Sequence, residues 1–272
     1  MPLPAHGSGL LALLPAGWLS GEETSSITAV EAGMGDAEVF RIGASARYLK
    51  VAAREAVDGL RREIERTRWL GARGVTVPLL LRTLETPDFV AMLTTELPGV
   101  LPSTLPTVAR SGPARSIRAA VEIIAHAFAA LHALPADDCP FDESVDVRLA
   151  RARRAIARGE IDPAQFDERN SGRTAQQILD WLVAHRPTRA DPVVVHGDAT
   201  FDNMRIDAGG KLGLLDCGHA GRGDRYIDLE RIADEIAEQF GAQWIEPFWR
   251  SYGIPIWDQT RADFFADLYE LF

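Results

Sequence analysis

The stretch His196-Gly197-Asp198-Ala199-Thr200-Phe201-Asp202-Asn203 follows the apolar run Val193-Val194-Val195, and Leu214-Leu215-Asp216 comes after it beyond a short hairpin. A continuous apolar run that ends in a polar loop is typical of a buried strand leading into a functional loop. The second segment repeats this pattern of a strand followed by an acid. Two capped turns between strands would give similar letters, because Asp and Asn are common in turns. The two motifs together, at this spacing, favour function.

The chemistry that suits these residues is phosphoryl transfer from a magnesium-bound nucleoside triphosphate. Such a reaction needs a carboxylate that orients the attacking hydroxyl and accepts its proton, and oxygen ligands that hold the metal against the phosphates. Asp198 is the expected catalytic base, and Asn203 and Asp216 are the expected magnesium ligands. An acid, an amide five residues later and a second acid at a strand end mirror the kinase catalytic loop and its metal-binding aspartate.

A kinase-like site also needs a cation that reaches the phosphates. Lys50 lies in a strand-like run with apolar neighbours, so its ammonium must find a carboxylate or a ligand. Glu63 on the following helix is the natural partner, although Glu65 is also available and spacing barely separates them. Gly35 lies in a two-glycine turn that could close over the triphosphate, but such a turn is more often only a hairpin. A surface lysine and an exposed helical acid are the alternative interpretation.

The pattern along the chain predicts an α+β fold with two lobes. Residues 26–97 alternate short strand-like runs with turns, and only about 54–73 shows helical spacing. Breakers cluster over 98–103, after which helices dominate. We therefore expect a nucleotide-binding sheet lobe at 1–97 and a catalytic and substrate-binding helical lobe at 98–272. The helices expected in the second lobe cover residues 114–132, 146–158, 173–186, 226–240, 242–251 and 260–271.

Composition narrows the class of protein. The 29 Lys and Arg against 39 Asp and Glu give a net charge of −10, which repels nucleic acid and attracts cations. The short apolar run at 10–14 has no basic flank and is too short to span a bilayer, so we expect a cytoplasmic protein with no membrane partner. Only Cys139 and Cys217 are present, and both are expected to be ordinary thiols. The arginines at 148, 151, 153 and 154 are expected to face water.

Beyond these motifs, a collinear series of segments resembles the aminoglycoside phosphotransferases, in particular the 3′-phosphotransferase branch that modifies kanamycin and neomycin. The segments extend over nearly the whole chain. They are Trp69-Leu70, Leu131-His132-Ala133-Leu134, Asp138-Cys139-Pro140-Phe141-Asp142, Val194-Val195-His196-Gly197-Asp198, Asp216-Cys217-Gly218, Gly221, Asp224-Arg225-Tyr226, Asp228 and Glu270-Leu271-Phe272. The resemblance implies a bilobal protein-kinase-like fold and transfer of the γ-phosphate of ATP or GTP to a drug hydroxyl, most naturally the 3′ one.

The resemblance also implies where the ligands bind. Nucleotide choice depends on the backbone near Thr94, Glu96 and Leu97, and the sequence leaves ATP and GTP open. A polycationic aminoglycoside needs converging acids in a cleft, and we expect a small-molecule partner and a monomer. The acids carried over from the resemblance are Asp167, Glu168, Glu235, Glu238, Glu270 and the terminal carboxylate of Phe272.

Three departures from the family pattern bear on the substrate more than on the chemistry. His219 stands where arginine is usual, and a neutral histidine supplies less positive charge near the phosphates. Asp234 replaces a frequent basic residue, and Tyr269 replaces an aspartate that contacts the amino sugar. Two alternatives therefore stay open. One is a kinase of the same fold that acts on streptomycin or a cellular amino alcohol, and the other is a non-catalytic nucleotide or drug binder.

Overall fold

The computed structural model describes residues 9–30, 37–43, 46–105, 116–189 and 191–272. The chain divides into two compact units. The first comprises Met1–Pro98 together with Gly213–Gly218, and the second comprises Gly99–Leu212 and His219–Phe272. The expected division after residue 97 left the short segment 213–218 in the second lobe, whereas the structure groups it with the first unit.

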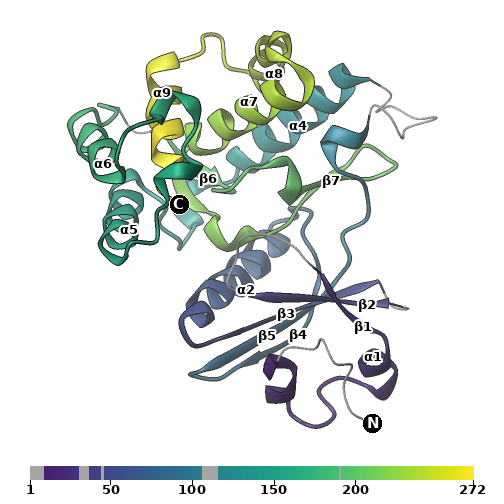
Figure 1. Cartoon of the computed structure of the whole chain (residues 1–272). Helices are drawn as coiled ribbons and strands as arrows, with labels where there is room; N and C mark the ends of the chain where they lie inside the picture. The colour runs from purple at the N-terminus through teal and green to yellow at the C-terminus, as the bar shows by residue number, and fades with distance from the viewer. Residues whose placement is uncertain (1–8, 31–36, 44–45, 106–115, 190) are drawn as a thin grey trace. The chain divides into compact units, whose positions relative to one another are not determined.

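The first unit is built on a five-stranded sheet in the order β1-β2-β3-β5-β4, with every neighbouring pair antiparallel. Its elements are α1 (Gly21–Ser25), β1 (Ile27–Val30), β2 (Glu38–Ile42), β3 (Arg47–Ala53), α2 (Val57–Ala72), β4 (Leu80–Glu85) and β5 (Phe89–Thr95). The helix α2 lies along one face of the sheet (Figure 1). Strand β5 is buried from Phe89 to Thr94, as expected for an inner strand with both faces covered.

Alternation along β3 assigns its side chains to two different cores. Leu49 and Val51 pack with the N-terminal segment on one face of the sheet. Ala52 lies on the other face with the apolar stripe of α2. Because successive side chains of a strand point to opposite faces, Lys50 shares the α2 face with Ala52. The strand period therefore directs the lysine toward the helix that carries Glu63.

The second unit is mainly helical. Its elements are α4 (Ile117–His132), α5 (Val145–Arg158), α6 (Ala175–Ala184), β6 (Pro192–Val195), β7 (Met204–Ile206), β9 (Gly221–Asp224), α7 (Tyr226–Phe240), α8 (Ile245–Tyr252) and α9 (Gln259–Tyr269), and β8 (Leu212–Leu214) continues into the first unit. Strands β6 and β9 pair antiparallel. One core joins α5, α6 and α9 around β6. None of the helices in the described part of the chain combines the length and hydropathy needed to cross a lipid bilayer.

The helices lie close to the predicted ranges, with one error of orientation on α5. Arg148 was expected in water, but only 3% of it is exposed. Arg151 is also largely covered, with 23% of its side chain exposed. The helical period identified an arginine-rich face correctly but could not show that a buried acid, Glu143, lies against part of it. In contrast, Arg153 and Arg154 are exposed as expected.

Candidate active site

In the first unit, Lys50 is paired with two acids that are far from it in sequence. Its Nζ lies 2.8 Å from Oε1 of Glu63 and also forms an ion pair with Oδ1 of Asp216. Glu65, the competing partner, is exposed to solvent. The side chains of Lys50 and Glu63 are 19% and 14% exposed, so their charges are screened less than those of surface pairs. The pair fixes the ammonium close to the Asp216 carboxylate.

Asp216 is held in an unusual backbone conformation. Its φ is +50°, in the left-handed region where Asp is one of the few residues tolerated besides Gly. The strand that precedes it is anchored by a 2.8 Å hydrogen bond from the backbone N–H of Leu214 to the carbonyl of Thr76. Half of the Asp216 side chain is exposed, at 50%. The local geometry thus presents a carboxylate at the end of β8 with oxygen atoms accessible to a ligand.

In the second unit, Asp228 holds the loop that follows β6. The two carboxylate oxygens of Asp228 accept the backbone N–H groups of His196 at 2.7 Å and Gly197 at 2.8 Å. The ring of His132 contacts the same carboxylate at 3.0 Å, and its other nitrogen lies 2.7 Å from the Tyr252 hydroxyl. Burial alone would raise the pKa of Asp228, but the bonds from His132 and Gly197 lower it. The loop therefore rests on a buried, ionised acid.

The carboxylate of Asp198 is hydrogen-bonded at both oxygens. Nδ2 of Asn203 donates to Oδ2 of Asp198 at 2.9 Å and to its carbonyl at 3.0 Å. The hydroxyl of Tyr269 donates to Oδ1 at 3.2 Å. Because the bonds to Asn203 use its amide nitrogen, the amide oxygen is left to serve as an acceptor or cation ligand. The structure thus brings together the acid and the amide that the sequence singled out, and adds a tyrosine.

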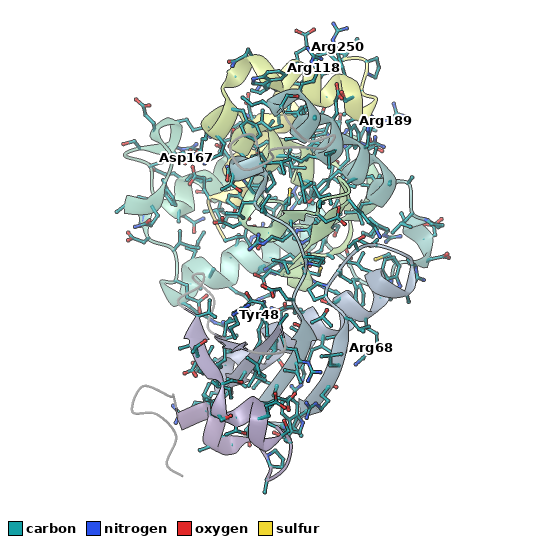
Figure 2. All side chains as sticks on the ribbon, turned by 90° about the vertical axis from the view of Figure 1, so that its right-hand side faces the viewer. Tyr48, Arg68, Arg118, Asp167, Arg189 and Arg250 are labelled. Atoms are coloured by element: carbon teal, nitrogen blue, oxygen red, sulfur yellow. The ribbon has the colours of Figure 1, made fainter. Side chains whose placement is uncertain are left out.

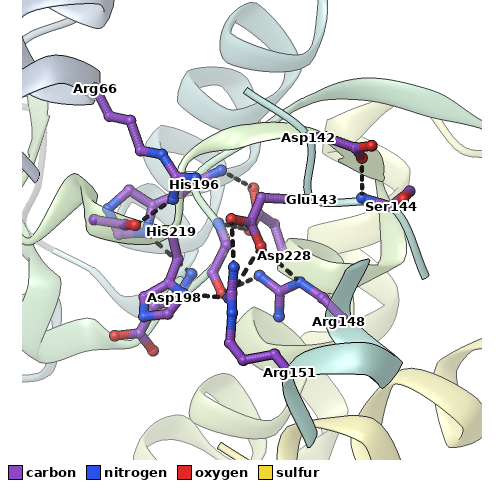
Figure 3. A network of polar contacts seen from close by, with 12 residues as sticks. Arg66, Asp142, Glu143, Ser144, Arg148, Arg151, His196, Asp198, His219 and Asp228 are labelled. Atoms are coloured by element: carbon purple, nitrogen blue, oxygen red, sulfur yellow. Dashed lines mark hydrogen bonds and ion pairs between the residues drawn. The ribbon is translucent and has the colours of Figure 1, made fainter. Parts of the chain in front are cut away.

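A buried charge cluster supports the same loop (Figure 3). Glu143, which has no exposed surface, contacts Arg151 at 3.0 and 3.2 Å and Arg148 at 3.4 Å. Nη2 of Arg148 donates to the carbonyl of Gly197 at 2.7 Å. Nη1 of Arg151 lies 3.0 Å from Nδ1 of His219, and because a guanidinium can only donate, that ring nitrogen accepts. His219, which stands where arginine is usual in the family pattern, is therefore hydrogen-bonded to Arg151.

The acids expected to bind substrate fall into two groups. In the first, Oε1 of Glu270 accepts the backbone N–H of Asp167 at 3.0 Å and the side-chain amide of Asn170 at 3.2 Å. Burial raises the pKa of Glu270. Asp167, labelled in Figure 2, and Glu168 are exposed on a neighbouring short turn. The structure therefore brings these three acids together near the C-terminal end of α9.

The second group lies on α7. Glu235 is 3.9 Å from Nη2 of Arg231, and Asp234 is 3.8 Å from the same nitrogen. Burial raises the pKa of Glu235, while Arg231 opposes the effect. Glu238, one turn further on, is exposed. Arg231 also covers the ring of Tyr269, with 4.8 Å from its Cζ to the ring centroid. This group is thus connected to Asp198 through an arginine and a tyrosine.

The residues expected to bind the nucleotide lie at the end of β5 and just after it. Thr94 is buried in β5, and its hydroxyl donates to the Tyr48 carbonyl at 3.5 Å. The backbone N–H of Glu96, just past β5, donates to the carbonyl of Ala46 at 2.7 Å. Leu97 follows, with its side chain against Gly213. Gly35 lies outside the described residues.

Phe272 offers an aromatic face to two arginines. Its ring lies below the guanidinium of Arg148, at 5.3 Å, and that of Arg151, at 5.7 Å. Such cation–π contacts are attractive because the face of the ring is electron-rich. The ring of Phe272 therefore packs against two arginines, one of which bonds to the loop that follows β6.

Sequence reasoning gave no role to several supporting residues. Asp228, Glu143 and Arg148 hold the loop but belong to no recognisable local motif of their own. One signal was available for His132, which lies on the buried stripe of α4 and so required a polar partner. The sequence could not say that the partner would be Asp228, which lies 96 positions away.

A small antiparallel sheet that carries a lysine–glutamate pair, together with a helical unit that carries an aspartate–asparagine loop after a strand, defines a kinase-like phosphotransferase fold. Comparison with known proteins agrees. The chain belongs to the phosphotransferase enzyme family, whose model matches residues 26–265. The protein is thus a phosphotransferase that acts on a hydroxyl group.

Among characterised relatives, an aminoglycoside 3′-phosphotransferase of Streptomyces fradiae is 34% identical over 83% of this chain and 85% of its own length. A streptomycin 3″-kinase of Streptomyces griseus is 31% identical over 77% of each protein. Among solved structures, an aminoglycoside 3′-phosphotransferase of type VIII has a TM-score of 0.78 at 30% identity and covers 91% of this chain and 94% of its own. The aminoglycoside phosphotransferase APH(3″)-Id of Streptomyces rimosus has a TM-score of 0.80 at 28% identity and covers 92% and 93%.

Proposed function

We propose that this protein transfers the γ-phosphate of ATP or GTP to a hydroxyl of an aminoglycoside, with the 3′ hydroxyl of a kanamycin-type drug as the leading acceptor. The proposal rests on the hydrogen bonds that hold the Asp198 carboxylate after β6. Asn203 donates to this carboxylate, and Asp228 anchors the backbone of the same loop. Such an activity would confer resistance to the drug. Both cysteines are free thiols, which suits a reducing cytoplasm.

In the proposed reaction, Asp198 accepts the proton of the attacking hydroxyl. The drug oxygen forms a bond to the γ-phosphorus, the bond between that phosphorus and the β–γ bridging oxygen breaks, and the nucleoside diphosphate leaves with the electron pair. Lys50, held by Glu63 at 2.8 Å, supplies a fixed positive charge for the phosphates. Residues that hold a base and a cation in place lower the barrier by removing the need for reorganisation.

Magnesium fits the donor set of the two candidate ligands. Asp216 offers a carboxylate and Asn203 an amide oxygen, both hard oxygen ligands of the kind that Mg²⁺ prefers. No group of three or more His, Cys, Asp or Glu suited to a metal occurs in the described part of the chain. Two protein ligands completed by substrate phosphates are the usual arrangement for this ion. When bound, magnesium would neutralise charge on the transferred phosphoryl group.

Recognition of the drug would rest on the acids at the end of α9 and on α7. Glu270 and Asp167 lie within one hydrogen-bonded group, and Glu235 lies on the helix beside Tyr269. Several ammonium groups of an aminoglycoside can each find a carboxylate there. Phosphorylation of streptomycin at its 3″ hydroxyl is the second candidate. The relative from Streptomyces griseus is named for that activity, and APH(3″)-Id has been solved with ADP and streptomycin.

The test combines product analysis with one matched pair of variants. The chain is incubated with Mg-ATP or Mg-GTP and either kanamycin or streptomycin, diphosphate release is followed, and NMR locates the new phosphate. Asp198→Asn should lower kcat by about 10²–10⁴-fold, the usual contribution of a positioned base. Asp202→Asn alters an exposed acid of the same loop and should leave kcat near the wild-type value. Undiminished turnover by the Asp198 variant, or no transfer to either drug, would reject the proposal.

A further inference from the structure

Tyr269 contacts the candidate base directly, although it lies 71 positions away in sequence. Its hydroxyl donates to Oδ1 of Asp198 at 3.2 Å, while Asn203 donates to Oδ2 at 2.9 Å. Each oxygen of the carboxylate therefore holds one donor. A carboxylate bonded at both oxygens cannot rotate freely, so the pair fixes the direction of the remaining lone pairs.

The tyrosine ring itself is held firmly. It is the last residue of α9, and its neighbours Leu268 and Leu271 are 1% and 0% exposed. The guanidinium of Arg231 lies over the ring, 4.8 Å from the centroid, and is steadied by Glu235 at 3.9 Å. A cation–π contact in such a partly desolvated place is stronger than one at the surface. The hydroxyl thus has a defined position before any substrate arrives.

The protonation of this hydroxyl decides what it can offer to a ligand. Burial, and then the negative charge of Asp198, raise the pKa of Tyr269 well above its ordinary value. The phenol is therefore neutral, with one proton and two lone pairs. Its single proton is already given to Asp198. A molecule that approaches the base meets the tyrosine oxygen only as a hydrogen-bond acceptor.

We propose that Tyr269 is a positioning and specificity residue, which orients Asp198 and selects acceptor molecules that carry a hydrogen-bond donor beside the hydroxyl to be phosphorylated. The inference rests on the proposed function. The group recognised is a neighbouring hydroxyl or an ammonium on the acceptor sugar. A drug that carries only a hydrogen atom or an ether oxygen at the neighbouring position would give the tyrosine oxygen no hydrogen bond. An unsatisfied oxygen costs free energy in a partly buried site.

The test is a double-mutant-type cycle, in which wild-type protein and one variant are each assayed with a drug and with an analogue that lacks one hydroxyl. The probes are kanamycin A and its 2′-deoxy and 4′-deoxy analogues, which lack one or the other hydroxyl next to the 3′ position. With wild-type protein, one analogue should show kcat/KM lowered by about tenfold, the value of one hydrogen bond. With Tyr269→Phe, kcat for kanamycin A should fall by about tenfold. With Tyr269→Phe, kcat/KM for the same analogue should be no more than about twofold lower than for kanamycin A, because the tyrosine oxygen that accepts the hydrogen bond is already absent.

The controls separate this inference from the proposed function. Tyr226→Phe removes the hydroxyl of another buried tyrosine, which accepts from the backbone of Asp258 and does not bond to Asp198. With this variant, the ratio of kcat/KM between kanamycin A and each deoxy analogue should equal that of the wild type, and the KM for the nucleotide should be unchanged. Equal sensitivity of wild type and Tyr269→Phe to both deoxy analogues would overturn the role of Tyr269. Turnover retained by Asp198→Asn in the same experiment would overturn the proposed function instead.

Discussion

Replacing Glu143 with glutamine should destabilise the second unit more than any surface change, because it removes the carboxylate that forms ion pairs with both Arg148 and Arg151. Glu143 has no exposed surface and lies 3.0 Å from Arg151 and 3.4 Å from Arg148. At an effective dielectric constant of about 20, one pair of unit charges about 3 Å apart attracts by roughly 5 kcal/mol before desolvation. Breaking a buried pair from one side costs about 3–5 kcal/mol, since a buried charge is left unpaired.

We therefore expect Glu143→Gln to lower the free energy of unfolding by about 3 kcal/mol, near the lower end of that range. Arg148 keeps its bond to the Gly197 carbonyl, which limits the loss. The assay is urea unfolding followed by tryptophan fluorescence. A double variant with Arg148→Met should recover part of the loss, because the unpaired charge is removed with its partner. A Glu143→Gln midpoint within experimental error of wild type, or no recovery in the double variant, would refute the reasoning.

Two further predictions concern the same unit. Gly197→Ala places a Cβ 2.1 Å from the carbonyl oxygen of His219 at a φ of +87°, and should cost about 3 kcal/mol or more in unfolding free energy. Gly172→Ala, with a φ of +81° and open space, should cost only about 1–2 kcal/mol; equal losses in urea would contradict the steric argument. Burial, followed by the charge of Asp234, raises the pKa of Glu230 to about 9. A folded-state pKa above the unfolded value of 4.5 gives stability that is fully present below pH 4.5 and lost as pH rises toward 9. Glu230→Gln should therefore flatten the fall in urea midpoint between pH 5 and 9, and an unchanged slope would disprove the assignment.

Local pattern in the sequence was enough for the framework of this protein. The apolar run before Asp198 and the spacing to Asn203 identified a strand that ends in a loop, and the structure places η8 (Phe201–Asn203) there. Lys50 was expected in a strand with an acidic partner on the following helix, and the structure pairs it with Glu63, while the alternative Glu65 is exposed. The helix over 226–240 has the predicted bounds. These features are local, because each depends on residues within one or two turns or strand repeats.

Tertiary structure alone decided which distant groups meet. Arg148 was assigned to water from its helical face, and its burial depends on Glu143, which lies in the segment before the helix and packs against β9. The bond between Tyr269 and Asp198 joins the end of α9 to the loop after β6. Periodicity tells which side of a helix or strand is covered, but it carries no information on what covers it. Partner choice between buried charges is set by how whole elements pack. The strand and loop around Asp198 could therefore be predicted from the sequence, while the residues that hold the loop could not.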